Sequence, residues 1–201
     1  MTISAAEVKK LRDLTGAGMM DCKTALKETY GNVEKAVEFL RKKGIASAQK
    51  RSDRTANEGV IMSYVHPGNR LGVLVELNCE TDFVAKTEDF MALAKDLAMQ
   101  IAATNPLAIH REDVPEAVIE KEKEIYRAQM KDQKKPDNVI EKILTGKLDK
   151  YFQETVLMEQ GFVKDPNKTV KEHLLFVSGK LGENMSIRRF VRYQLGEAIT
   201  A

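Results

Sequence analysis

The sequence predicts an α+β fold in which an N-terminal three-helix bundle precedes an antiparallel sheet core packed with helices. Apolar residues at helical spacing alternate with glycine-containing turns over residues 4–44. Two strand-like runs follow at residues 60–65 and 71–77, and a third lies near the end of the chain at residues 185–195. Helical patterns fill most of the sequence between the second run and the third, and residues 155–163 look extended, with Gly161 as a turn.

Length and composition are those of an ordinary globular protein. The 201 residues suffice for one or two domains, and 31% of them are charged against 43% hydrophobic. A net charge of +2, from 32 basic and 30 acidic residues, argues against a dedicated nucleic-acid binder. No apolar run approaches the roughly 20 residues that span a bilayer, and the chain begins as a capped helix rather than a signal peptide. We therefore expect a cytoplasmic protein without nucleic-acid or membrane partners.

Three short helices are expected at the start of the chain. Ser4 and Glu7 have capping-box spacing, so the first helix begins there, and Gly16 ends it because glycine tolerates a positive φ. A second helix follows, and Asn32 can cap a third helix that Gly44 closes. The apolar positions expected to share one core are Val8, Leu11 and Leu14, then Cys22, Ala25 and Leu26, then Val33, Ala36, Val37 and Leu40.

The turn at residues 16–18 (Gly-Ala-Gly) invites comparison with phosphate-binding loops. It follows a helix, lacks the third glycine of a dinucleotide fingerprint and has no Gly-Lys-Ser/Thr ending, so we expect no bound nucleotide and no cofactor. After this turn, Met19, Met20 and Lys23 are candidates for a partner surface, because methionine adapts to varied partners. The alternatives are core packing for the two methionines and solvation for the lysine.

A basic stretch follows the third helix. Residues 41–54 contain six basic side chains against one acid, Asp53, but no aromatic ring on which a base could stack. This composition favours a solvated linker over a phosphate-binding surface. We therefore expect a three-helix module at residues 1–46, a basic linker at residues 47–57 and an α+β core at residues 58–201.

The first two strand-like runs are expected to form a hairpin with His66 at its tip. The other two histidines, His110 and His173, have no close spacing to His66 or to a cysteine, so we expect no metal site. The two cysteines, Cys22 and Cys79, lie far apart in apolar patterns. We interpret both as reduced, buried side chains, with a disulfide or a reactive thiol as the alternative.

Helical patterns occupy most of the second half of the chain. The apolar positions of residues 90–101 share one helix face, Pro115 and Pro136 can open two further helices, and Thr169 can cap a last one. The charged helix after Pro115 either buries its thin apolar stripe against a second copy of the chain or remains a surface helix. In the last strand, the apolar residues expected to close the core are Val191, Tyr193 and Leu195.

The most informative stretch joins the second strand to the helix of residues 90–101. The polar triplet of Glu80, Thr81 and Asp82 suits a strand end, and Phe83 follows it at a short corner. Since most aromatic side chains are buried, one interpretation is that Phe83 pins the helix to the sheet. The other interpretation is that Asp82 and Phe83 present an anion and a ring to a partner.

A hydrolase site built from Cys79, Glu80 and Asp82 is a further alternative. If the strand continues, Cys79 and Glu80 point to opposite faces, and no histidine lies nearby in the sequence to act as a base. We therefore expect that the chain is not an enzyme.

Two stretches resemble the signature sequences of bacterial elongation factor Ts. They are residues 15–23 (Thr-Gly-Ala-Gly-Met-Met-Asp-Cys-Lys) and residues 78–84 (Asn-Cys-Glu-Thr-Asp-Phe-Val), which occur in the family's order and spacing. The resemblance runs almost end to end. It implies a ubiquitin-associated-like fold for the three-helix module and a role as a guanine-nucleotide exchange factor for elongation factor Tu in protein synthesis.

The resemblance also implies roles for single residues. The stretch Thr81, Asp82, Phe83 and Val84 would displace Mg²⁺ from Tu, with the ring as a wedge, while Met19, Met20, Lys23 and His66 would make other contacts with Tu. The implied partners are GDP-bound and nucleotide-free Tu, and the chain could form a homodimer or an assembly of two Ts with two Tu. The alternative is a passive protein-binding module, or a translation-associated partner, without exchange activity.

Overall fold

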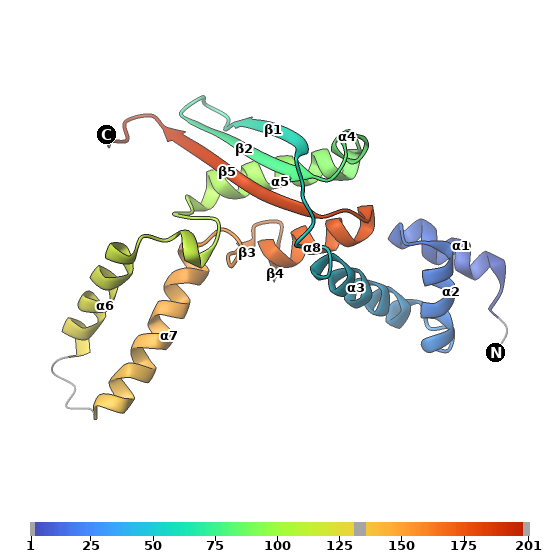
Figure 1. Ribbon diagram of the computed structural model, residues 1–201, viewed down its shortest axis with the longest axis horizontal. Coiled ribbons are helices and arrows are strands. Elements are labelled where there is room, and N and C mark those ends of the chain that lie inside the picture. Colours follow the sequence, from blue (N-terminus) through green and yellow to red (C-terminus); the bar gives the residue numbers. More distant parts are fainter. Residues whose placement is uncertain (1–2, 131–135, 199–201) are drawn as a thin grey trace. The chain divides into compact units, whose positions relative to one another are not determined.

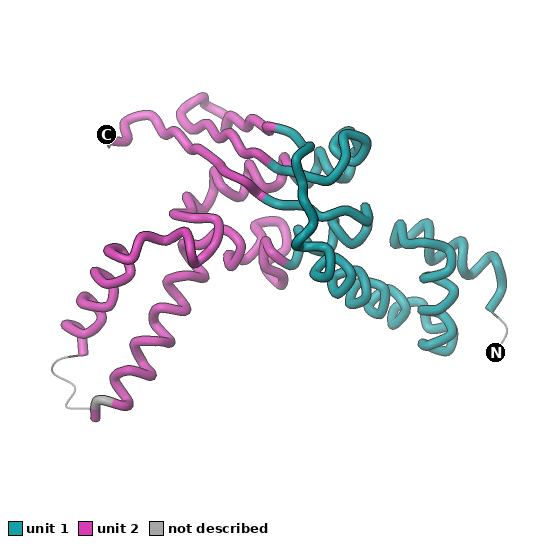
Figure 2. Tube along the Cα trace, viewed as in Figure 1, with its two compact units in different colours: residues 1–60, 77–93, 172–186 teal, residues 61–76, 94–171, 187–201 magenta. Residues whose placement is uncertain are grey.

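The computed structural model describes residues 3–130 and 136–198 (Figure 1). The chain forms two compact units, each built from separate stretches of sequence (Figure 2). Unit 1 comprises residues 1–60, 77–93 and 172–186, and unit 2 comprises residues 61–76, 94–171 and 187–201. The division into residues 1–46, 47–57 and 58–201 stays a prediction.

The predicted three-helix bundle is present within unit 1. Its helices are α1 (Ala5–Thr15), α2 (Met19–Glu28) and α3 (Val33–Gln49). Ser4 and Glu7 form the capping box of α1, and Gly16 ends that helix with a φ of 69°. The side chain of Asn32 caps α3 by accepting a hydrogen bond from Lys35 N. The buried core of the bundle consists of Val8, Leu11, Cys22, Ala25, Leu26, Ala36 and Leu40. The prediction that Leu14 belongs to this core is wrong, because Leu14 is 66% exposed.

The prediction that Gly44 ends the third helix is wrong, because α3 continues for another turn to Gln49. The reason is a close approach to α8 (Val170–Leu181). A Cβ atom added at Gly179 would lie 2.7 Å from the carbonyl oxygen of Gly44. The glycines therefore allow two helix backbones to touch, and the residues predicted as the start of the linker are helical.

The three predicted strands form one sheet. They are β1 (Glu58–Val65), β2 (Leu71–Cys79) and β5 (Met185–Gln194), in the order β1-β2-β5. The hairpin between β1 and β2 closes through a 2.9 Å hydrogen bond from His66 N to Leu71 O. Leu195 N donates to Arg70 O, and Arg189 pairs with Glu76, so β5 runs antiparallel to β2. The predicted α+β class is confirmed.

The predicted helices after the hairpin are also present. Helix α5 (Glu88–Thr104) buries Phe90, and in unit 2 its later turns lie along one face of the sheet (Figure 1). After the single turn η1 (Arg111–Asp113), α6 (Glu116–Met130) packs against α7 (Asp137–Thr155). The side chains packed around Phe152 at the base of this pair include Val118, Ile119, Leu148 and Tyr151, so α7 covers part of the thin stripe of α6.

A second, two-stranded sheet was not predicted. It pairs β3 (Gly161–Phe162) with β4 (Asp165–Thr169). The five residues of β4 are Asp-Pro-Asn-Lys-Thr, a sequence without apolar alternation and with a proline. Such a sequence carries the signals of a turn rather than those of a strand, which explains the omission.

The inner and outer faces of the last part of β5 are exchanged relative to the prediction. The side chain of Arg192, which alternates with the residues expected to close the core, is only 11% exposed, whereas Tyr193 is 71% and Leu195 63% exposed. Two consecutive exposed residues, Arg188 and Arg189, change the phase of the alternation in β5. Tyr193 and Leu195 therefore do not close the core, and Val191 is 37% exposed.

Candidate functional site

The candidate site is the corner between β2 and α5. Thr81 caps the short helix α4 (Asp82–Ala85) by accepting a hydrogen bond from Val84 N. Thr87 then accepts a hydrogen bond from Phe90 N at the start of α5. Two threonine caps therefore change the direction of the chain twice within a few residues, and the one-turn helix α4 protrudes between them.

Phe83 lies on the outside of this corner. Its side chain is 79% exposed, while Ala85 of the same helical turn is buried and Val84 is half-buried. The interpretation of Phe83 as a core residue is therefore wrong. Burying a phenylalanine side chain stabilises a protein by about 1.5–3 kcal/mol. Phe83 makes little of this contribution to the stability of the free protein. An exposed ring on an ordered turn is available to a partner.

Asp82 lies beside the ring and is ionised. Lys86 Nζ donates a 2.6 Å hydrogen bond to Asp82 Oδ2, one helical turn away. This bond holds the pKa of Asp82 below its usual value. The Asp82 side chain remains 49% exposed, so its carboxylate can exchange Lys86 for a donor on a partner. The corner thus presents an anion and an apolar ring together.

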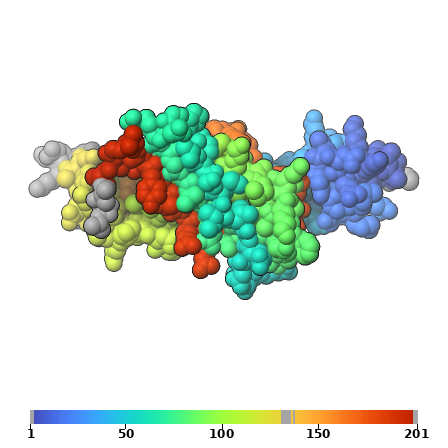
Figure 3. Space-filling view, turned by 90° about the horizontal axis from the view of Figure 1, so that it is seen from above, coloured from blue at the N-terminus to red at the C-terminus, as the bar shows by residue number. Residues whose placement is uncertain are grey.

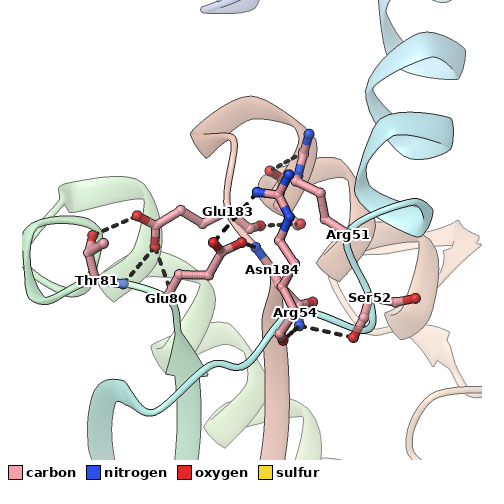
Figure 4. Close-up of polar contacts among 8 residues, drawn as sticks. Arg51, Ser52, Arg54, Glu80, Thr81, Glu183 and Asn184 are labelled. Atoms are coloured by element: carbon pink, nitrogen blue, oxygen red, sulfur yellow. Dashed lines mark hydrogen bonds and ion pairs between the residues drawn. The ribbon is translucent and has the colours of Figure 1, made fainter.

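A polar network fixes the back of the corner (Figure 4). The carboxylate of Glu183 accepts hydrogen bonds from Glu80 N, Thr81 N and Thr81 Oγ1. In return, Glu80 Oε1 accepts a 2.7 Å hydrogen bond from Asn184 N, and Glu80 Oε2 lies 3.6 Å from Arg54 Nη1. Sequence analysis missed Glu183 and Asn184, because they are more than 100 residues from the corner and belong to no motif.

Cys79 lies behind the corner with a thiol that is poorly suited to catalysis. It is buried and unbridged, as is Cys22, so the prediction of two reduced, buried cysteines is confirmed. Cys79 Sγ donates to Thr81 O at 3.1 Å. Burial, followed by the charge of Glu183, raises the pKa of Cys79 to about 11. Because a nucleophilic cysteine needs a lowered pKa, this environment argues against the hydrolase alternative.

The other predicted contact residues are placed on the surface. Met19, Met20 and Lys23 are all exposed near the start of α2, so the alternative of core packing for the two methionines is wrong. His66 is exposed at the tip of the hairpin in unit 2, where its Nδ1 lies 2.9 Å from the hydroxyl oxygen of Tyr64. The residues near α2 belong to unit 1, as does the corner.

The outer face of the three-stranded sheet is an apolar surface that sequence analysis missed. β1, β2 and β5 lie side by side at the surface (Figure 3). Beside the apolar residues, Glu76 pairs with Arg189 at 2.7 Å and with Arg188 at 3.7 Å, so its charge is compensated within the chain. We call the following residues the outer sheet face: Ile61, Val65, Leu74, Val191, Tyr193 and Leu195.

The described part of the chain contains neither a candidate metal site nor a candidate membrane-spanning helix. Within residues 3–130 and 136–198, no group of three or more histidine, cysteine, aspartate or glutamate side chains could hold a metal ion. None of the helices that the structure describes is both long enough and apolar enough to cross a membrane.

Comparison with known proteins gives a consistent result. A family model described as elongation factor TS matches residues 3–197. Elongation factor Ts of Geobacter sulfurreducens is 55% identical over 199 residues, which cover 99% of this chain and 92% of the relative. The proteins of the same name from Carboxydothermus hydrogenoformans and Moorella thermoacetica are each 57% identical over 197 residues. Those residues cover 98% of this chain and 91% and 97% of the two relatives.

Proposed function

The chain belongs to the elongation factor Ts family, and we propose that it is a guanine-nucleotide exchange factor for elongation factor Tu. It binds Tu·GDP, weakens the hold of Tu on Mg²⁺ and GDP, and leaves Tu free to bind GTP. The observation that supports this proposal best is the exposed ring of Phe83, which an ordered corner presents beside the carboxylate of Asp82.

The physical logic of exchange requires no acid, base or nucleophile in this chain. Binding of two ligands to Tu is coupled reciprocally, so a factor that loosens GDP must itself be loosened by GDP. In the proposed complex, Phe83 enters the nucleotide-binding domain near the groups that position Mg²⁺, and Asp82 holds the corner there by hydrogen bonds. Thr81 and Val84 belong to the same inserted turn, with Thr81 as its cap.

Further contacts are proposed for two other parts of the chain. Met19, Met20 and Lys23 form a partner surface on α2, where flexible thioethers adapt to the shape of Tu. His66 makes a separate contact from the tip of the hairpin. These contacts supply binding energy that does not depend on Phe83.

The proposal is tested by stopped-flow release of a fluorescent GDP from elongation factor Tu at fixed Mg²⁺. We expect the release rate to rise with the concentration of this chain and to saturate. Binding to Tu·GDP without faster release would contradict the proposal and would indicate the passive binding module instead. An equal amount of heat-denatured chain controls for effects of added protein.

For self-association, we propose that the outer sheet face pairs with the same face of a second copy, either as a homodimer or within an assembly of two Ts with two Tu. Six apolar side chains from three strands form this face, and burial of such patches drives association. The charge of Glu76 is already compensated by Arg189 and Arg188, so stacking two copies buries no unpaired carboxylate.

Replacing Leu74 by lysine in the central strand places a charge in the middle of this face. We expect sedimentation velocity to show a dimer for the unmodified chain and a monomer for Leu74→Lys. The matched control is Val163→Lys, since Val163 is similarly exposed but lies outside the face. An unmodified chain that is monomeric alone and binds Tu only as a one-to-one complex would contradict the proposal, and weaker Tu binding by Leu74→Lys would then assign the face to Tu.

A further inference from the structure

We propose that Glu183 is the positioning residue of the exchange corner, acting on Phe83 through Thr81. This inference rests on the proposed exchange function and deepens it, because it names the group that keeps the wedge in place. Glu183 follows Gly182, whose φ of 80° turns the chain between α8 and β5. The carboxylate is thereby brought against the end of β2 within unit 1 (Figure 4).

Both carboxylate oxygens of Glu183 accept hydrogen bonds from the corner. Its Oε2 accepts from Glu80 N at 3.1 Å and from Thr81 N at 3.0 Å, and its Oε1 accepts from Thr81 Oγ1 at 2.6 Å. Hydrogen bonds to an ionised acceptor are shorter and stronger than those between neutral groups. The carboxylate therefore holds both the backbone and the side chain at the point where β2 ends.

Thr81 passes this constraint on to Phe83. A hydroxyl group has one hydrogen to donate, and Thr81 donates it to Glu183, so its lone pairs remain free to accept the hydrogen bond from Val84 N. That second bond caps α4, the helix that carries Phe83. Glu183 therefore fixes the orientation of the cap, and the cap fixes the turn.

Glu183 is itself held in place by its neighbours. Ser178 Oγ donates to the Glu183 carbonyl oxygen, and the adjacent Asn184 N donates to Glu80 Oε1 at 2.7 Å. The side-chain amide of Asn184 donates, through Nδ2, to Ser52 O at 3.0 Å and to Arg54 O at 2.6 Å. The turn at residues 182–184 thus joins the end of β2 to the segment that follows α3.

External support is needed because α4 cannot hold itself. A helix of four residues is too short to be stable without tertiary contacts, and the exposed ring adds almost no packing of its own. An unsupported turn would sample many orientations, and ordering it in the complex would consume part of the binding energy of the ring. Glu183 holds the turn in one orientation before the chain binds Tu.

The experiment compares Glu183→Ala and Glu183→Gln with the unmodified chain in stopped-flow GDP release from Tu. For Glu183→Ala we expect the maximal release rate at saturating chain to fall tenfold or more, while the half-saturating concentration changes less than threefold. Glutamine keeps the length of the side chain and one carbonyl acceptor, so Glu183→Gln should lower the maximal release rate less than Glu183→Ala does. The control is Glu159→Gln in unit 2, which removes a carboxylate paired with Arg111.

A second pair of variants tests the route through Thr81. Thr81→Ser keeps the hydroxyl and should retain most of the maximal rate, whereas Thr81→Val should lose about as much as Glu183→Ala. Because both residues act on one turn, the double variant Glu183→Ala/Thr81→Val should lose no more than either single variant. Additive losses, or a maximal rate unchanged in Glu183→Ala, would overturn the proposal.

Thiol modification of Cys79 gives a readout that does not require Tu. In a Cys22→Ser background, Cys79 is the remaining cysteine, and its thiol donates to Thr81 O inside the corner. We expect Glu183→Ala to react at least tenfold faster with a thiol reagent than Glu183→Gln. The two variants remove the same charge, so the difference between them reports the loosened turn.

The two readouts separate the inference from the proposed function. Should the unmodified chain fail to accelerate GDP release, the exchange function is wrong, and the rate of Cys79 modification still decides whether Glu183 fixes the corner. Equal modification rates in Glu183→Ala, Glu183→Gln and the unmodified chain would overturn the inference alone. Thermal unfolding followed by circular dichroism confirms that each variant is folded at the temperature of the assay.

Discussion

Phe83→Ala is expected to lower the maximal rate of GDP release from Tu by about ten- to a hundredfold. Burying a phenylalanine in the complex contributes about 1.5–3 kcal/mol, and each 1.4 kcal/mol corresponds to about a tenfold change in an equilibrium. If this energy goes into displacing Mg²⁺ and GDP, its loss appears in the release rate. Binding to Tu should weaken much less, because the proposed contacts of Met19, Met20, Lys23 and His66 do not involve the ring.

The stability of the free chain is a useful check on this variant. Since Phe83 is 79% exposed, its removal should leave the thermal midpoint almost unchanged. Phe176→Ala, at a phenylalanine of α8 that is 37% exposed, is the matched control and should not affect release. Stopped-flow release and equilibrium binding should be measured together, since equal losses in both would show that the ring is an ordinary contact rather than a wedge.

Gly59→Ala is expected to be the most destabilising of the glycine substitutions in the sheet. Gly59 in β1 has a φ of 144°, a conformation that L side chains rarely adopt. An added Cβ would also lie 2.1 Å from Leu77 O and 2.7 Å from Asn78 Cα, both of which are backbone atoms and cannot rotate away. We expect a loss of about 3 kcal/mol or more in the free energy of unfolding.

Urea unfolding followed by circular dichroism measures this loss. The control is Gly72→Ala in the neighbouring strand β2, where an added Cβ meets no atom within 4 Å and φ is not positive. That substitution should change the free energy of unfolding by no more than about 0.5 kcal/mol. Similar losses at the two positions would mean that general strand propensity, rather than the close approach to Leu77, determines the cost.

Local signals explain why much of the fold could be predicted from the sequence. The capping box of Ser4 and Glu7, the cap at Asn32 and the turn at Gly16 act over a few residues, and the structure contains all three. The hairpin was likewise predictable, because two β-rich runs flank a short turn. These features depend on neighbours in the sequence rather than on the rest of the fold.

The errors arose where tertiary contacts decide the structure. Gly44 lies inside α3 because it faces Gly179, and no pattern near Gly44 indicates that partner. The inner and outer faces of β5 were exchanged, since two consecutive exposed arginines shift its alternation. Both errors come from applying a local rule to a residue whose environment is set by a distant segment.

The candidate site likewise contains residues that the sequence could identify and residues that only the structure reveals. Asp82 and Phe83 could be identified from their motif, although only the structure shows that the ring is exposed. Glu183 and Asn184 carried no signal, because glycine and asparagine at residues 182 and 184 are typical of any turn and a single glutamate between them belongs to no motif. A sequence alone does not say which carboxylate will meet the end of a strand 103 residues earlier.

The large sequence separation of these hydrogen-bonded residues also sets the order in which the corner can be completed during synthesis. The bundle of α1, α2 and α3 closes through contacts among the first 40 residues and can form early. The bonds from Glu80 and Thr81 wait for residue 183, which is synthesised more than 100 residues later. A partly synthesised chain therefore carries the Phe83 turn before the carboxylate that holds it exists.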